Sequence, residues 1–139
     1  MFITRFTRLN GSTEDYFYHT EKEAVDHLFL FLDDDSGLYK NIAVLDDRNY
    51  VLHILPFRDG KPIEIISHKC IVRLRKEYAS PEEIKRNHMF VVTNINENTE
   101  RLNITCISTD MCIPPTEIVG LDMVKPIKTE PNHPHLSVL

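Results

Sequence analysis

The chain has 139 residues, of which 42% are hydrophobic and 27% are charged, so it falls in the range of ordinary globular domains. Its formal net charge is −5, and the whole excess lies in residues 1–65, which hold 7 Lys and Arg against 12 Asp and Glu. Such a balance argues against non-specific binding to nucleic-acid phosphates, which needs clustered positive charge, and it favours basic proteins as partners.

Targeting and membrane signals are weak in this sequence. The first residues, Met1–Phe6, lack the long apolar core of a targeting segment. The longest apolar run, Leu28–Leu32, is far shorter than the ~20 residues that a membrane-spanning helix needs. Three cysteines without a secretion signal are typical of reduced thiols. We therefore expect a cytoplasmic protein that makes no contact with a membrane.

Residues 1–66 are predicted to form an α+β unit that begins with two strands and a helix. Phe2–Leu9 alternates between apolar and polar residues, and Tyr16–His19 reads as the returning strand. Thr20 and Glu23 have the spacing of a capping box, in which each side chain accepts from the other residue's backbone amide. The helix that follows is expected to present an apolar face made of Ala24, Val25, Leu28, Phe29, Phe31 and Leu32.

Two more strands complete the N-terminal unit. Gly37 is expected to end the helix, and strands are predicted at Lys40–Asp46 and Tyr50–Leu55. Asp59-Gly60 favours a tight two-residue turn, with Ile63–Ile66 as an extra strand after it. The order strand, strand, helix, strand, strand predicts a small antiparallel sheet with one helix on a face.

Residues 67–127 carry a pattern of many short strands, typical of a small β-barrel. Val72 and Leu74 alternate with arginines, and a twelve-residue connection follows at Lys76–Asn87. A second capping-box sequence, Ser80–Glu83, places Pro81 at the first helical position, so one helical turn is expected there. A last strand is predicted at Leu121–Ile127, and residues 128–139 are predicted to be a mobile tail.

The clearest element of the C-terminal half is a β-hairpin over Met89–Ile107. Both arms alternate with a period of two around a polar loop at Asn96–Glu100. The expected register pairs Phe90 with Cys106, Val92 with Ile104, and Ile95 with Arg101. It buries the apolar rows on one face and leaves Thr93, Asn103 and Thr105 on the other. A slip of one residue would turn one apolar row toward solvent, so the pattern fixes the register.

The C-terminal half resembles the SH3-like barrels. The resemblance rests on the opening strand Cys70–Arg75, the long first loop, the central hairpin and the closing segment Ile118–Val124. It is nearest to small bacterial proteins that begin with a strand of the type Val-Val-Arg-Leu-Lys. The whole chain also resembles uncharacterised proteins of Gram-positive bacteria and their mobile elements. The resemblance implies a barrel that binds peptides or nucleic acid. A Trp- and Tyr-lined groove for proline-rich peptides is not expected, because the chain has no Trp and Tyr78 is its only Tyr after residue 50.

The run Asp33, Asp34 and Asp35 is the most conspicuous candidate binding site. It could dock a basic partner or hold a cation, although an EF-hand loop starting at Asp33 would need Gly and Glu where Leu38 and Val44 stand. The alternative is a solvated acidic turn at the end of a helix. There the three carboxylates would oppose the helix dipole, at a cost of a few tenths to ~1 kcal/mol each.

The only basic run is Arg73, Arg75 and Lys76, followed closely by Tyr78. Arg73 and Arg75 share one face of their strand and could meet a phosphate or an acidic peptide. Lys85 and Arg86 would extend such a surface toward nucleic acid. The alternative is that these side chains are a solvated strand face.

No motif for chemistry stands out. Zinc sites favour paired ligands two to four residues apart, and in the set His68, Cys70, Cys106 and Cys112 the last two are too widely spaced, with Cys106 on the predicted core face. No Gly-rich phosphate loop is present. We expect no metal, no cofactor and no catalytic residues. The leading hypothesis is a non-enzymatic binding module or regulatory protein that acts through protein contacts, for example in a mobile element. The alternatives are a nucleic-acid-binding small barrel that uses its Arg/Lys face, and a small enzyme with an unrecognised site.

Overall fold

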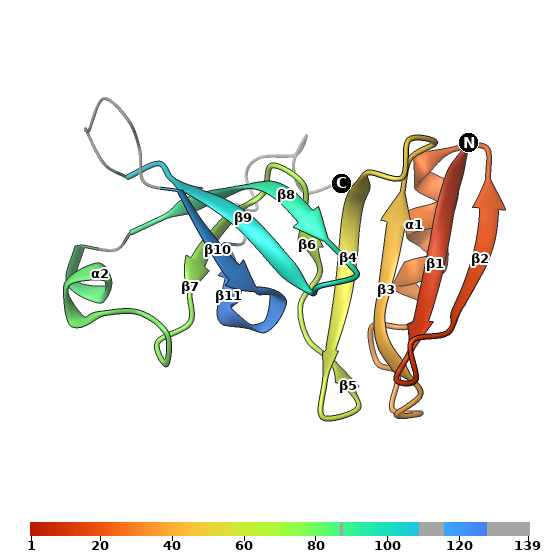
Figure 1. Cartoon of the computed structure of the whole chain (residues 1–139), viewed down its shortest axis with the longest axis horizontal. Helices are drawn as coiled ribbons and strands as arrows, with labels where there is room; N and C mark the ends of the chain where they lie inside the picture. Colours follow the sequence, from red (N-terminus) through yellow and green to blue (C-terminus); the bar gives the residue numbers. More distant parts are fainter. Residues whose placement is uncertain (87, 109–115, 128–139) are drawn as a thin grey trace.

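A computed structural model of the chain describes residues 1–86, 88–108 and 116–127. Its α+β architecture consists of two antiparallel sheets and a helix packed on the first of them (Figure 1). The elements of the first half are β1 (Phe2–Arg8), β2 (Thr13–Tyr18), α1 (Glu21–Phe29), β3 (Tyr39–Leu45), β4 (Val51–Arg58), β5 (Lys61–Pro62) and β6 (Ile66–Ser67). Those of the second half are β7 (Ile71–Leu74), α2 (Pro81–Arg86), β8 (Phe90–Asn96), β9 (Arg101–Cys106), β10 (Thr116–Gly120), the 3₁₀ helix η1 (Leu121–Met123) and β11 (Val124–Pro126).

The first sheet has the order β2-β1-β3-β4-β5, with β6 also paired to β4. The predicted succession of two strands, a helix and two strands is confirmed. Asp59 (φ 55°) and Gly60 (φ 79°) both adopt the left-handed conformation that a tight hairpin turn requires, as their sequence predicts. The extra strand at Ile63–Ile66 is wrong in its bounds, because the residues that pair with β4 after the turn are Lys61–Pro62 in β5 and Ile66–Ser67 in β6.

Helix α1 begins as predicted. The Glu23 amide donates to Thr20 Oγ1 at 3.2 Å, and the Thr20 amide donates to Glu23 Oε1 at 3.2 Å. The predicted end at Gly37 is wrong, because the helix ends at Phe29 and the next amides bond to carbonyls three residues back. The reason lies in the sequence: three aspartates follow, and Asp is a poor helix former that also opposes the dipole at a C-terminal end.

The second sheet has the order β10-β9-β8-β7-β11. In the described residues this is an open path with β10 and β11 at its ends, so the antiparallel sheet is established and the closed SH3-like barrel remains a prediction. The single last strand predicted at Leu121–Ile127 is wrong, because η1 separates β10 from β11. Leu121 and Val124 are both buried, and a spacing of three brings them to one side in a 3₁₀ turn but not in a strand.

The β8–β9 hairpin is confirmed over half of its predicted register. Phe90 pairs with Cys106 and Val92 with Ile104, but a β-bulge follows and Ile95 pairs with Leu102 instead of Arg101. Val92 and Ile95 are three residues apart, so a regular strand would point them to opposite faces. The bulge adds one residue between them, and both side chains reach the core with 0% and 5% exposure.

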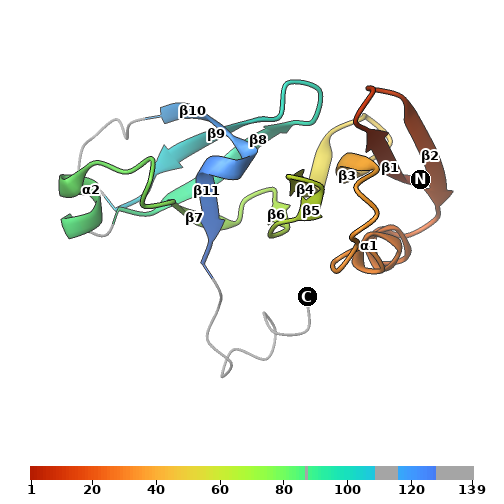
Figure 2. The ribbon, with the colours of Figure 1, turned by 90° about the horizontal axis from the view of Figure 1, so that it is seen from below.

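The central strands of the first sheet are buried on both faces. Against α1 it packs a cluster that includes Phe6, Ile42 and Leu55. The opposite face, with residues such as Ala43 and Ile54, joins the second sheet in one continuous core. Figure 2 shows α1 and the β8–β9 hairpin on different sides of the first sheet. Residues 1–66 and 67–127 therefore share a hydrophobic core. Residues 128–139, the predicted tail, lie outside the described part of the chain.

The shared core predicts a large difference between two neighbouring substitutions in β8. Val92→Asp puts an unpaired charge into the core and should cost about 4 kcal/mol or more, a large part of the ~5–15 kcal/mol by which a typical domain is stable. Thr93→Asp changes an exposed side chain at the bulge and should shift stability by about 0.5 kcal/mol or less. Urea unfolding followed by circular dichroism measures both. Equal stability of the two variants would contradict this placement of the core.

Candidate functional site

The acidic run predicted as a binding site lies in an exposed loop after α1. Asp33 and Asp35 are exposed, whereas Asp34 is partly buried and its Oδ2 accepts from the amide and the hydroxyl of Ser36. Asp34 therefore shapes the loop, and Asp33 and Asp35 remain free to meet a partner. Neither of them has an ion-pair partner among the described residues, so their charges are open to solvent.

Exposed apolar side chains lie near these aspartates. Two of these apolar residues, Phe29 and Leu32, are predicted from the sequence to lie on the buried face of the helix, and that prediction is wrong. The exposed fractions of the side chains are largest at Leu30 (78%), Leu9 (66%) and Leu38 (54%). Leu9 belongs to the β1–β2 turn, and its amide donates to the Leu38 carbonyl at 3.2 Å. We call the following set the acidic end: Leu9, Phe29, Leu30, Leu32, Asp33, Asp35 and Leu38.

The β4–β5 turn borders the acidic end. A Cβ added at Gly60 would lie 3.4 Å from the Cα of Gly37, so the two backbones approach closely. Figure 1 shows the β1–β2 turn, the loop after α1 and the β4–β5 turn together at one end of the first sheet. This turn contributes Asp59 and also the exposed cations Arg58 and Lys61. With Asp33, Asp34 and Asp35 counted, four carboxylates face two cations, so the end keeps a negative charge.

The predicted basic run does not form one surface. Arg75 Nη2 lies 3.4 Å from Glu64 Oε1, so this guanidinium is already paired. Lys76 and Tyr78 are exposed in the connection after β7, where the Tyr78 amide donates to the Arg75 carbonyl. Lys85 is exposed on α2, and the Arg86 side chain is outside what the structure describes. Arg73 is the member of the run that stays exposed on the sheet.

Arg73 has an unexpected neighbour on the adjacent strand. It stands directly opposite Lys125 in the β7–β11 pair, and both side chains are exposed. Like charges directly opposite each other destabilise a sheet, and neither residue has an ion-pair partner among the described residues. The sequence alone does not indicate Lys125, because no local pattern shows which strand pairs with the last one.

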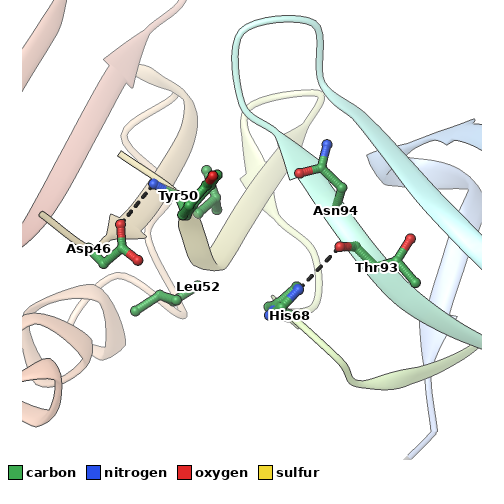
Figure 3. Close-up of a pocket in the computed structure, with 7 residues that line it drawn as sticks. Asp46, Tyr50, Leu52, His68, Thr93 and Asn94 are labelled. Carbon is green, nitrogen blue, oxygen red and sulfur yellow. Dashed lines mark hydrogen bonds between the residues drawn. The ribbon is translucent and has the colours of Figure 1, made fainter. Parts of the chain in front are cut away.

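A cleft of about 240 Å³ opens where the two sheets meet (Figure 3). It is lined by Asp46, Tyr50, Val51, Leu52, His68, Thr93 and Asn94. Asp46 Oδ1 accepts from the amides of Arg48 and Tyr50, which closes the β3–β4 turn. His68 Nε2 lies 3.1 Å from the Thr93 carbonyl at the bulge. The cleft is smaller than usual ligand pockets, and its polar groups already hold the local fold.

A chain of three side chains resembles the catalytic arrangement of serine hydrolases. Ser67 Oγ lies 2.7 Å from His53 Nδ1, and His53 Nε2 lies 2.8 Å from Glu21 Oε2. His53 of β4 and Ser67 of β6 are direct cross-strand partners, and Glu21 is the first residue of α1. No sequence motif signals this contact, because it depends on the pairing of β4 with β6.

The surroundings of Ser67 do not support acyl transfer. That reaction needs free backbone amides beside the nucleophile to stabilise an oxyanion. The amides of the next three residues are all engaged: His68 donates to the Leu52 carbonyl, Lys69 to Val92, and Cys70 to Ser67 itself. We therefore interpret the Glu21–His53–Ser67 chain as a structural link between α1 and the sheet.

The cysteines offer no chemistry in the described residues. Burial raises the pKa of the half-buried Cys70, which keeps it a protonated thiol, and Cys106 is a buried free thiol. Cys112, His133 and His135 lie outside the described part of the chain. Within that part, no three His, Cys, Asp or Glu side chains cluster as metal ligands would.

Comparison with protein-family models, with curated proteins and with solved structures finds no match for this chain. Among the described residues, no helix has the length and apolar character needed to cross a bilayer. The function of this chain must therefore be inferred from its own surfaces.

The structural interpretation of Ser67 makes a specific prediction. A fluorophosphonate probe, which labels activated serines, should leave the folded protein unmodified, as intact-mass spectrometry would show. His53→Gln should lower the free energy of unfolding by about 1 kcal/mol, because it weakens the contacts with Glu21 and Ser67. Labelling at Ser67 that disappears in His53→Gln would instead make this a hydrolase site.

Proposed function

We propose that the protein is a non-enzymatic binding module that recognises a basic, amphipathic segment of a partner protein through its acidic end. The observation that carries the proposal is the exposure of five apolar side chains around Asp33 and Asp35. Single exposed apolar residues are ordinary, but a group of them beside unpaired charges is typical of an interaction site.

The partner's chemistry follows from the composition of this surface. Leu30, Leu32 and Leu38 supply apolar area that gains free energy when it is covered. The aspartates select Lys or Arg beside the partner's apolar residues and increase the rate of encounter. A regulatory or accessory role in the cytoplasm, as expected from the sequence, is compatible with a module of this kind.

A peptide-binding experiment tests this proposal. The probe is a fluorescently labelled amphipathic peptide of Leu and Lys, and its binding is measured by fluorescence anisotropy. Leu30→Ser should weaken binding about tenfold, equivalent to ~1.4 kcal/mol, because Leu30 is the most exposed apolar residue of the acidic end. The double variant Asp33→Asn and Asp35→Asn should weaken binding and flatten its dependence on salt.

Matched controls lie elsewhere on the same molecule. Phe17 is 60% exposed on β2, and Asp47 is exposed in the β3–β4 turn. Phe17→Ser and Asp47→Asn remove the same kinds of group and should leave peptide affinity unchanged. If the controls weaken binding as much as Leu30→Ser does, the peptide adheres generally and the acidic end is not a site.

The second candidate function is nucleic-acid binding by the C-terminal half as an SH3-like barrel. The strand order with β11 beside β7, the long connection that contains α2 and the 3₁₀ turn before β11 support this fold as a proposal. The specific observation in its favour is the opposed pair Arg73 and Lys125, whose repulsion an anion would relieve. The acidic balance of the whole chain disfavours it.

We expect no retention of DNA or RNA at physiological salt, as measured by gel shift at low micromolar protein. Two adjacent cations neutralise few phosphates, and the affinity falls steeply as salt displaces such contacts. The decisive comparison is Arg73→Gln with Lys125→Gln against Arg48→Gln, an exposed cation in the β3–β4 turn. Retention by the wild type and by Arg48→Gln, but not by the double variant, would establish the second function in place of the first.

A further inference from the structure

The turn between β8 and β9 places an acidic side chain in the seam between the two sheets. Glu97 is 7% exposed, and its Oε1 accepts from Arg5 Nη1 of β1 at 2.9 Å. Arg5 is also held by both carboxylate oxygens of Asp15 on β2, at 2.8 Å and 3.0 Å. One guanidinium therefore lies between two carboxylates, and this group, in which Glu97 is buried and Arg5 and Asp15 are partly buried, carries one excess negative charge.

Two oxygen atoms beside this group have no hydrogen-bond partner among the described residues. One is Glu97 Oε2 and the other is Oδ1 of Asn41, a fully buried residue of β3. The Asn41 amide nitrogen donates to the Glu97 backbone carbonyl at 3.4 Å, so the Asn41 side chain lies beside the Glu97 backbone. Buried acceptors without a donor cost free energy, and both of these atoms are acceptors when Glu97 is ionised.

We propose that Glu97 is a proton-binding site at the seam, and that its protonated Oε2 donates to Asn41 Oδ1 when the hairpin turn is docked on the first sheet. A single proton then cancels the excess charge of the group and supplies the missing donor. Glu97 Oε1 continues to accept from Arg5. Docking of the β8–β9 turn on the first sheet thereby depends on pH.

The electrostatics of the site agree with this proposal. Burial raises the pKa of the Glu97 carboxyl, Arg5 lowers it, and the negative charge of Asp15 raises it further. The pKa of Arg5 is itself raised, chiefly by its hydrogen bond with Asp15, so it remains a cation. The other charged groups of the turn are Glu100, which faces Lys40 of β3 at 3.6 Å, and the exposed Arg101. The turn also meets η1, which carries Asp122, because the Leu121 amide donates to the Glu100 carbonyl.

The sign of the pH effect follows from the raised pKa. A carboxyl whose pKa is higher in the folded chain than in the unfolded chain binds its proton more tightly when folded. Its contribution to stability is fully present below the unfolded value and is lost as pH rises through the folded value. Most paired carboxylates make the folded state less stable as pH falls. The contribution of Glu97 is therefore recognised by its opposite sign, a gain of stability as pH falls.

Nuclear magnetic resonance provides the test. Carbon-13 shifts of the Glu side chains are followed through a pH titration, and the Glu97 signal is assigned by its loss in Glu97→Gln. We expect Glu97 to titrate above the ordinary value of about 4.3 for Glu. Asp15→Asn should lower the titration point of Glu97, because it removes the charge that repels the ionised form. A Glu97 that titrates at or below the ordinary value would overturn the proposal.

Stability measurements give an independent test. Glu97→Gln keeps the shape of the side chain and its amide can donate to Asn41 without a proton. It should remove the part of the pH dependence that belongs to Glu97, so the stability of the variant relative to wild type falls as pH is lowered. Glu100→Gln, in the same turn but half-buried, serves as the control. Identical pH profiles for Glu97→Gln and wild type would also overturn the proposal.

Discussion

The β-bulge in β8 is the constraint on which the rest of this structure depends. It brings Val92 and Ile95 to the same side of the strand, so that the hairpin presents an unbroken apolar face to the first sheet. The carbonyl of the bulged residue, Thr93, is met by His68, which ties the hairpin to the segment between β6 and β7. Without the extra residue, either Ile95 would face solvent or the turn that carries Glu97 would point away from the seam.

The sequence predicts local structure well where a short-range physical signal exists. The Thr20–Glu23 capping box, the Asp59-Gly60 turn and the alternation of Phe90 and Val92 each depend on neighbours within a few residues. It fails where tertiary burial decides the outcome. Val92 and Ile95 are three residues apart at a bulge, and Leu121 and Val124 are three residues apart at a 3₁₀ turn. This spacing indicates such a structure only when both residues of the pair are known to be buried.

The sequence predicts only part of the candidate site, because charged runs are local features and the burial of apolar side chains is not. Asp33 and Asp35 are exposed as expected, and charge runs in loops are visible from sequence alone. Two of the apolar side chains beside them, Phe29 and Leu32, fit the apolar face of a longer predicted helix, which would have buried them. Contacts across strands, such as Arg73 with Lys125 and His53 with Ser67, require the order of strands in a sheet. Glu97 lay in a stretch interpreted only as a polar turn, and nothing local indicates its burial.

Ion pairs and turn hydrogen bonds engage many of the carboxylates in residues 1–65, so the free acidic side chains are confined to a few places on the surface. Glu14 and Asp15 are paired with arginines of β1, Asp26 with Lys22, and Glu64 with Arg75. Asp46 closes a turn and Asp34 shapes a loop, so these carboxylates hold the fold. Asp33 and Asp35 neither form an ion pair nor shape a turn among the described residues, and they lie where apolar side chains are also exposed. Part of the surplus charge counted from composition thus lies where the fold does not use it, which is the property expected of a surface that meets another molecule.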